Sequence, residues 1–162
     1  MANGERPQAI IAAEVPESRP PYGYPEPYGS RVRAAGRMRR PLGEVFGLTN
    51  FGVNLTRLPP GALSALRHTH TREDELVYIL EGEPTLVTGA GETRLHPGMC
   101  AGFKAGSGNA HHLVNRGDKD AVFLEIGDRD RGDTVVYPDD DLGRALSPEG
   151  RRIFVHRDGS PY

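Results

Sequence analysis

Short hydrophobic stretches, separated by glycine, asparagine, aspartate or proline, fill the chain from about residue 46 onward. Within 51–56, hydrophobic side chains occupy every second position, which is the period of a strand with two unlike faces. Further strand-like stretches follow at 75–82, 85–89, 93–98, 111–115, 121–127 and 133–138, and the C-terminal piece, 139–162, carries one more in RRIFVHRDG. Many short strands at this spacing, with no amphipathic helix of three turns among them, predict an all-β sandwich or barrel.

Residues 1–45 differ from the rest and predict an N-terminal arm, with the barrel occupying 46–162. The arm is rich in proline and glycine in RPPYGYPEPYG and then in arginine, at Arg31, Arg33, Arg37, Arg39 and Arg40. Proline fixes φ and removes a backbone donor, so we expect an extended segment rather than a domain. The arginines are typical of a solvated or salt-bridged stretch, with binding of an anionic ligand or nucleic acid as the alternative.

Composition narrows the class of protein. The 162 residues are 26% charged and 36% hydrophobic, and they include 21 glycines and 14 prolines, which fits short strands and tight turns. The net charge of −2 offers no general attraction for nucleic acid or anionic membranes. The single cysteine, Cys100, excludes an intrachain disulfide and a cysteine-based zinc cluster. No apolar run reaches the roughly 20 residues of a membrane span, and the apolar stretch at 9–13 is too short for a signal-peptide core, so we expect a cytoplasmic protein.

Two pairs of histidines and one glutamate form the candidate chemical site. In a strand, residues i and i+2 point to the same face, so His68 and His70 project together. Glu75 begins the strand 75–81 on an otherwise apolar face, where a carboxylate is costly unless it meets a cation. His111 and His112 begin another strand and point to opposite faces, so one of them can join the group. Three imidazoles and a carboxylate suit divalent Mn, Fe, Ni, Co, Cu or Zn.

The spacing of these residues resembles the first motif of the cupin superfamily, which is a glycine, His-x-His, a glutamate after three or four residues and a further glycine. In PPGALSALRHTHTREDELVYILEG, the matching residues are Gly61, His68, His70, Glu75 and Gly82. The interval from the first glycine to the first histidine is one residue longer than usual. Glu73 and Asp74 are alternative carboxylates, but neither keeps the spacing to the final glycine.

The second cupin motif, a glycine, Pro-x-Gly and a histidine followed four residues later by asparagine, resembles GMCAGFKAGSGNAHHLVN. The matching residues are Gly98, Ala105, Gly106, His111 and Asn115. Lys104 replaces the usual proline, and two extra residues precede the histidine. The spacing from histidine to asparagine selects His111 over His112, and the two motifs together cover 61–115.

The resemblance implies a double-stranded β-helix, or jelly-roll cupin barrel, with one divalent transition metal (Mn, Fe, Ni, Co or Zn) inside one mouth. Its ligands would be His68, His70, Glu75 and His111. Four protein ligands leave one or two positions of an octahedral ion open for a substrate oxygen or for dioxygen. The flanking sequence, from GLTNFGVNLTRLPPG to the DGSPY tail, also resembles a bacterial single-domain cupin subfamily associated with sugar-phosphate isomerases.

The expected function is metal-dependent chemistry on a small-molecule substrate, a polar metabolite, with isomerisation of a sugar or sugar phosphate as the leading case. One alternative is a non-catalytic metal- or ligand-binding cupin. Another is an Fe(II)-dependent dioxygenase, for which an apolar oxygen pocket could come from Val77, Ile79, Phe103 and Leu113. Isomerisation also needs a base, which the sequence leaves open between His112 and Glu125. Lys104 and the arginine-rich arm are the candidate phosphate contacts.

Other polar side chains have ordinary interpretations. We expect Lys104 to face solvent, with anion binding at the barrel mouth as the alternative, and His96 and His156 to lie at the surface. Cys100 is expected to be a small buried strand residue rather than a nucleophile. Tyr78 should face away from the metal cavity. The acidic run at 139–141 is expected to be a solvated loop.

A single small barrel leaves strand edges and apolar strand faces to be covered. The arm has the composition to lie across them, because Tyr22, Tyr24 and Tyr28 favour packing. We therefore expect a homodimer in which residues 20–45 contact the partner or the barrel edge.

Overall fold

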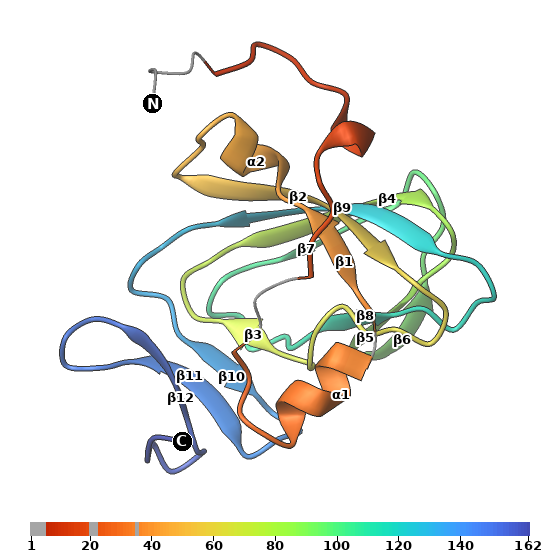
Figure 1. The fold of residues 1–162 in the computed structure, drawn as a ribbon. Helices are drawn as coiled ribbons and strands as arrows, with labels where there is room; N and C mark the ends of the chain where they lie inside the picture. Colours follow the sequence, from red (N-terminus) through yellow and green to blue (C-terminus); the bar gives the residue numbers. More distant parts are fainter. Residues whose placement is uncertain (1–5, 20–22, 35) are drawn as a thin grey trace.

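Within the described residues, strands form three antiparallel sheets (Figure 1). The computed structural model describes residues 6–19, 23–34 and 36–162. The largest sheet has the order β1 (Met38–Arg40), β2 (Phe51–Leu58), β9 (Ala121–Asp128), β4 (Glu75–Glu81) and β7 (Cys100–Phe103). A second sheet has the order β12 (Arg152–Val155), β11 (Leu142–Leu146), β10 (Val135–Tyr137) and β3 (Thr69–His70), and a third has β6 (Gly91–Arg94), β5 (Thr85–Thr88) and β8 (His112–Val114). The predicted all-β class is confirmed.

The inward faces of the central strands change from apolar to polar along their length. On β4, Ile79 and Val77 face the interior, and Glu75 follows them on the same face. On β9, Phe123 is fully buried and Glu125 follows it two residues later, directly opposite Val77. One end of the barrel is therefore a packed core, and the other end presents carboxylates.

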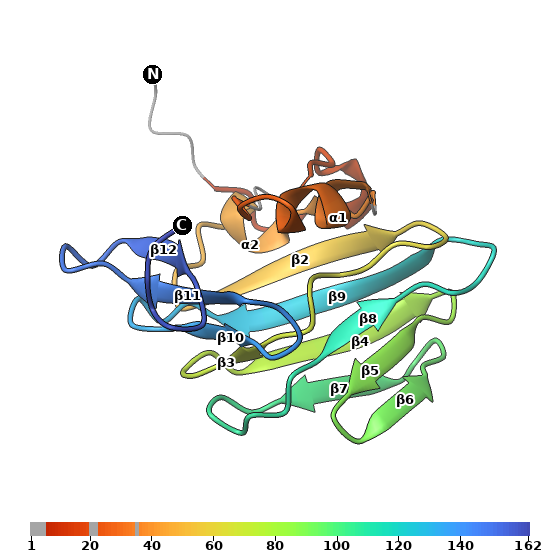
Figure 2. The same cartoon turned by 90° about the horizontal axis from the view of Figure 1, so that it is seen from below.

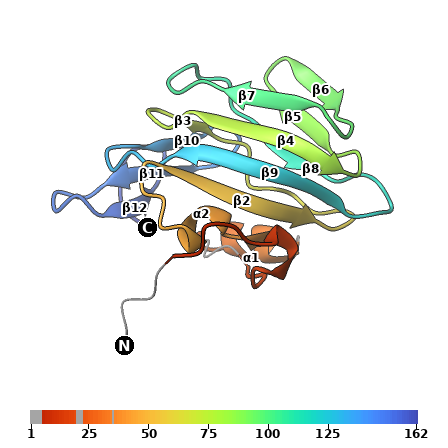
Figure 3. The ribbon, with the colours of Figure 1, turned by 90° about the horizontal axis from the view of Figure 1, so that it is seen from above.

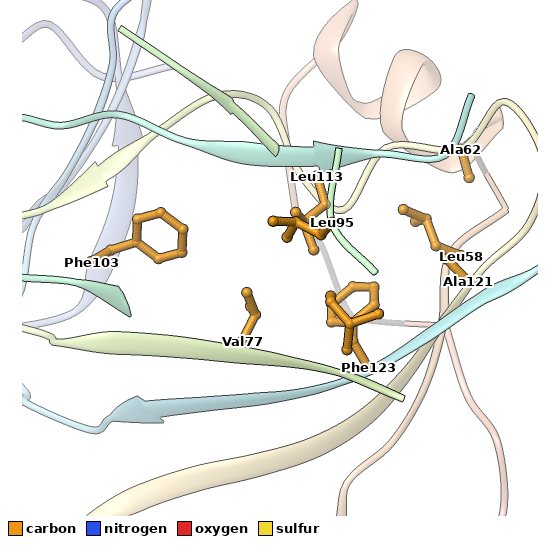
Figure 4. Close-up of a cluster of buried hydrophobic side chains, with 9 residues drawn as sticks. Leu58, Ala62, Val77, Leu95, Phe103, Leu113, Ala121 and Phe123 are labelled. Atoms are coloured by element: carbon orange, nitrogen blue, oxygen red, sulfur yellow. The ribbon is translucent and has the colours of Figure 1, made fainter. Parts of the chain in front are cut away.

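The apolar end is filled by one cluster of buried side chains. Figure 4 shows these side chains pointing toward one another between β4 and β9 on one side and β8 on the other. Phe123, Leu58 and Ile79 are completely buried, and burying a side chain of this size contributes about 1.5–3 kcal/mol. The cluster therefore fills the end of the barrel that lies away from the carboxylates.

A glycine turn ends β4 where the motif requires one. Gly82 has a φ of +72°, and a Cβ at this position would lie 2.5 Å from the carbonyl oxygen of Asp120. Only glycine fits both the left-handed backbone and the close approach. The other motif glycines, Gly61, Gly98 and Gly106, also have positive φ, as expected for turns between short strands.

The N-terminal segment is not extended throughout, contrary to expectation. It contains a 3₁₀ turn (Ala12–Glu14) and the helices α1 (Tyr28–Ala34) and α2 (Leu42–Val45), and β1 adds an edge strand to the large sheet. Both helices lie on the β2 side of the barrel (Figures 2 and 3). Hydrogen bonds between residues close in sequence, and the pairing of β1 with β2, satisfy backbone N–H and C=O groups. In an extended arm these groups would have to bond water instead.

Aromatic packing fixes the segment to the barrel. Tyr24 is buried against Tyr137 and Phe154, and Val32 of α1 joins the same cluster. Contact of residues 20–45 with the barrel edge is thus confirmed for the described part, whereas Tyr22 lies outside the described residues. Among the described residues, no helix has the length and apolar character needed to cross a bilayer.

Candidate metal centre

Three imidazole nitrogens converge on one carboxylate oxygen at the polar end of the barrel. The Oε2 atom of Glu75 lies 3.2 Å from Nε2 of His111, 3.7 Å from Nε2 of His70 and 3.8 Å from Nε2 of His68. His68 and His70 flank the start of β3, Glu75 begins β4, and His111 precedes β8, where its backbone pairs with that of His68. The structure therefore brings together all four residues selected from the sequence.

These separations fit ligands of a single ion. Metal–nitrogen and metal–oxygen bonds of about 2.0–2.2 Å place neighbouring ligand atoms roughly 3 Å apart. His68, His70 and Glu75 already have ligand atoms within 4.8 Å of one another. The Oε2 atom of Glu75 is buried and has no hydrogen-bond partner among the described residues. A buried carboxylate oxygen facing three imidazoles is what a divalent cation would satisfy.

Contacts behind the rings turn the Nε2 atoms toward this point. Nδ1 of His68 lies 2.8 Å from the carbonyl oxygen of Leu66, to which it can donate. Nδ1 of His70 lies 2.6 Å from Oδ2 of Asp133. The ring of His111 stacks on Phe103, with centroids 3.4 Å apart. Such contacts fix ring orientation and tautomer and leave Nε2 free as a ligand.

The protonation states also suit metal binding. Burial lowers the pKa of His68 to about 4, so the imidazole is neutral near pH 7. Burial alone would raise the pKa of Glu75, but contact with His111 and the nearby His68 and His70 lower it to about 2. Neutral imidazoles and an ionised carboxylate are the forms that coordinate a metal.

A second acidic group lies on the far side of His70. His70, Glu73 and Asp133 also have ligand atoms within 4.8 Å of one another. Here the histidine contributes Nδ1 rather than Nε2, and Glu73 is 2.6 Å from Arg152. Asp133 is fully buried and accepts hydrogen bonds from the backbone N–H groups of Thr71 and Arg72. Because the Asp133 oxygens are already hydrogen-bonded, we interpret Asp133 as a residue that positions His70 rather than as a metal ligand. No spacing in the sequence indicated this role.

The candidate ligands line a cavity of about 480 Å³ that is rich in charge. Five arginines line it: Arg37, Arg39, Arg129, Arg144 and Arg152. Four carboxylates also line it: Glu73, Glu75, Glu125 and Asp128. A divalent ion would add two positive charges and make the cavity attractive to an anion. The sequence predicted a solvated or salt-bridged stretch for the arm's arginines, with anion binding as the alternative, and the i and i+2 spacing of Arg37 and Arg39 is the signal that both can face one side of a strand.

Glu125, whose orientation the sequence left open, faces the cavity. Its Oε2 atom accepts a hydrogen bond from the Thr56 hydroxyl at 2.6 Å and pairs with Arg37. The other candidate base, His112, points to the opposite face of β8, where its Nδ1 lies 3.1 Å from the carbonyl oxygen of Ala65. The structure therefore brings Glu125, and not His112, to the site.

The remaining polar side chains lie away from the cavity. Lys104 is exposed, as expected, and so is His96, which contacts Glu83. His156 pairs with Asp141 at the surface. The other two members of the acidic run are also paired, with Asp139 bonded to Arg67 and Asp140 to Arg31.

The expectation that Cys100 is buried is wrong. Cys100 pairs with Tyr78 across β7 and β4, which puts both side chains on the outer face of the sheet, where both are exposed. The outward position of Tyr78 is as expected.

The fold and the site together define the class: a β-barrel protein with a candidate metal centre, formed by three histidines and a glutamate, inside the barrel mouth. The family model described as the Cupin domain matches residues 54–127. A solved cupin sugar phosphate isomerase from Silicibacter pomeroyi is 40% identical, with a TM-score of 0.86, 95% of this chain covered and 96% of that one. The chain belongs to the cupin superfamily, and the predicted cupin barrel is confirmed.

Two further structures show how widely this fold is used. A protein from Acidithiobacillus ferrooxidans, provisionally named a sugar phosphate isomerase, is 31% identical with a TM-score of 0.71, covering 79% of this chain and 81% of that one. A predicted oxalate decarboxylase from Thermotoga maritima is 22% identical with a TM-score of 0.58, covering 74% and 97%, and shares the fold alone. A comparison with curated protein sequences found no match.

Proposed function

We propose that this cupin is a metal-dependent isomerase that interconverts the aldose and ketose forms of a small sugar-type substrate. The observation that carries the proposal is a second carboxylate, Glu125, in the same cavity as the four candidate ligands. An isomerase needs both a Lewis acid for the oxygens and a base for the carbon-bound proton. The names of the two more similar relatives support a sugar phosphate as the substrate.

The proposed ligands are His68, His70, Glu75 and His111. A divalent ion bound there supplies polarisation of adjacent carbonyl and hydroxyl oxygens, which makes the neighbouring C–H more acidic. Because β4 pairs with β9 so that Val77 lies opposite Glu125 and Glu75 opposite Gly127, the two glutamates are diagonal neighbours. Diagonal neighbours have Cβ atoms roughly 7 Å apart, which leaves room for a substrate carbon between the carboxylates.

Glu125 is the proposed proton carrier. Among the described residues, Arg37 and Thr56 both bond its Oε2 atom, and Oε1 keeps free lone pairs. Oε1 would take the proton from the carbon bearing the hydroxyl group and return it to the neighbouring carbonyl carbon, while the hydroxyl proton moves to the former carbonyl oxygen. Both protons stay within the substrate overall, so no oxidant or reductant is needed.

The cavity composition supports this reaction over the dioxygenase. Of the four side chains expected to form an oxygen pocket, Ile79 and Phe103 belong to the packed core and do not line the cavity, whereas Val77 and Leu113 do line it. Phe103 is also occupied by its stacking contact with His111. The cavity is also lined by five arginines and four carboxylates, which is more charge than an apolar oxygen pocket would hold.

Solvent exchange tests the proposal directly. Metal-loaded protein incubated anaerobically in deuterated water with a panel of aldose and ketose phosphates should introduce deuterium at the carbon next to the carbonyl. Glu125→Gln should reduce the exchange rate by at least about 100-fold, which is the usual contribution of a general base, without loss of bound metal. Glu149→Gln, an exposed change between β11 and β12, is the control and should exchange at the wild-type rate. No exchange across the panel, together with oxygen consumption on a diketone, phenol or thiol, would contradict the proposal.

A further inference from the structure

Among the described residues, the guanidinium of Arg39 has no partner in the cavity wall. Arg39 lies on β1 opposite Thr56 of β2, and residues directly opposite in an antiparallel pair share a face. Thr56 is completely buried on the interior side, so Arg39 faces the cavity that it lines. Its Nε atom is buried without a hydrogen-bond partner, and its side chain makes no hydrogen bond or ion pair with the described residues.

Leaving such a group unpaired is costly. A buried donor without a partner loses about 1–3 kcal/mol, and more when it is charged. Burial, and then the neighbouring Arg37, lower the pKa of Arg39, while Glu44 and Glu125 oppose this effect. Arg129 adds a further positive charge nearby. An anion between these arginines would supply the missing hydrogen bonds and offset the repulsion.

The other cavity arginines are already engaged. Arg37 bonds Glu125 and the carbonyl oxygen of Ser64, and Arg152 is 2.6 Å from Glu73. Arg129 bonds the carbonyl oxygen of Leu48. Arg144 also has a buried Nε without a partner, but its guanidinium lies 3.8 Å from the buried carboxylate of Asp133. Arg39 is therefore the guanidinium with the most unused bonding capacity.

We infer that Arg39 is the core of an anion subsite that binds the phosphate group of a phosphorylated substrate, with Arg129 at its flank. The inference rests on the proposed isomerase function and deepens it, because it assigns the side chain that would hold the phosphate group of the substrate. The planar guanidinium can present two parallel N–H donors to two phosphate oxygens, which a lysine cannot do. The N-terminal segment thus supplies the phosphate contact, while the strands of the barrel supply the ligands and the base.

Binding of inorganic phosphate to metal-free protein tests the subsite separately from the metal, because phosphate can also bind a metal directly. Calorimetry should show binding to the wild type. Arg39→Gln should weaken it by about 10- to 100-fold, the loss expected for a charge-assisted pair, and Arg39→Lys should give an intermediate value. Arg116→Gln changes an exposed arginine paired with Glu92 and should bind phosphate as the wild type does. Thermal unfolding of each variant checks that the fold is intact.

Kinetics give the second reading. For a phosphorylated sugar, Arg39→Gln should raise KM by at least about 10-fold with a smaller change in kcat, and for the unphosphorylated sugar the two proteins should have similar KM values. Equal phosphate affinity in folded Arg39→Gln and wild type, or loss of binding in Arg144→Gln instead, would overturn the inference.

The two proposals fail separately. Deuterium exchange on an unphosphorylated hydroxy-carbonyl compound without any phosphate binding would remove the subsite and leave the isomerase. Phosphate binding that depends on Arg39, without exchange on any substrate, would remove the isomerase and leave the subsite.

Discussion

His70 is constrained through both of its ring nitrogens. Nδ1 lies 2.6 Å from Asp133, and Nε2 faces Glu75. Asp133 is itself fixed by the backbone N–H groups of Thr71 and Arg72, because its other oxygen accepts from both. The imidazole is therefore oriented before a metal ion binds, so less side-chain conformational entropy is lost on binding.

Asp133→Asn tests this positioning role. The amide keeps the shape but replaces the charged acceptor beside Nδ1 of His70, so metal affinity should fall by about 10- to 100-fold. A chelator competition assay measures this, and urea unfolding of the metal-free proteins separates it from loss of folding. Asp141→Asn is the matched control, because Asp141 contacts Nδ1 of His156 at 2.8 Å on the surface. Equal metal affinity in Asp133→Asn and wild type would show that the contact does not position the ligand.

The lowered pKa of His68 predicts a loss of stability on acidification. Its pKa is about 4 in the folded protein, against an ordinary histidine value of 6.5 that describes the unfolded chain. Below pH 6.5, the unfolded chain therefore binds a proton at His68 that the folded chain does not bind. Stability is then lost as the pH falls from 6.5 to 4, by about 2 kcal/mol between pH 7 and pH 5. Urea unfolding of metal-free protein at both values measures it. His68→Asn should remove this part of the slope and His96→Gln should not, whereas identical slopes in all three proteins would contradict the assignment.

The central strands follow from local sequence patterns, but β1 does not. Strands predicted at 75–82 and 121–127 appear as β4 (Glu75–Glu81) and β9 (Ala121–Asp128), because alternation and glycine turns are local signals. β1 is only Met38–Arg40, and its identity as a strand depends on pairing with β2. Without that pairing, the spacing of Arg37 and Arg39 puts both on one face but does not show that this face points inward.

The same contrast divides the site. The four candidate ligands were predictable because their spacing lies within two motifs, each confined to a short stretch of chain. Asp133, just before β10, and Arg144, on β11, reach the site at positions set only when the second sheet packs against the first. Contacts between sheets depend on tertiary packing, which no single-strand pattern encodes.

The turn after β4 gives a prediction at the scale of an element. Gly82→Ala should destabilise the protein by at least about 2 kcal/mol, because a left-handed backbone costs about 1–2 kcal/mol for a residue with a Cβ and the new atom would meet the Asp120 carbonyl oxygen at 2.5 Å. Gly89→Ala is the control, since nothing lies within 4 Å of a Cβ there. Chemical unfolding measures both. Equal stability of the two variants would show that the turn tolerates a side chain.

At the scale of the whole molecule, the outer face of the large sheet carries exposed apolar side chains. Leu76, Tyr78 and Leu80 of β4 are each 39–40% exposed, and Phe51 of β2 is 40% exposed. The described part of the N-terminal segment lies on the β2 side and packs against its own barrel, so this part does not cover β4 (Figure 3). A row of this kind in the middle of a sheet is typical of an interface.

We therefore propose that the homodimer expected from the sequence forms through this face. Light scattering should give twice the chain mass of 17.6 kDa, and Leu76→Asp should shift the protein to the monomer. Val136→Asp, at an exposed apolar position on β10, should remain dimeric. A wild-type monomer at micromolar concentration would contradict the proposal.

The central claim is that His68, His70, Glu75 and His111 hold one divalent metal. Elemental analysis of protein purified without a metal-affinity tag tests it most directly, in the wild type, His111→Ala and His112→Ala. We predict about one metal per chain in the wild type, as a single site with four protein ligands requires, with manganese or zinc favouring redox-neutral isomerisation and iron favouring a dioxygenase. His111→Ala should lose most of the metal and His112→Ala should keep it, because the two side chains point to opposite faces of the strand. A wild type without metal, or equal metal content in the two variants, would contradict the account.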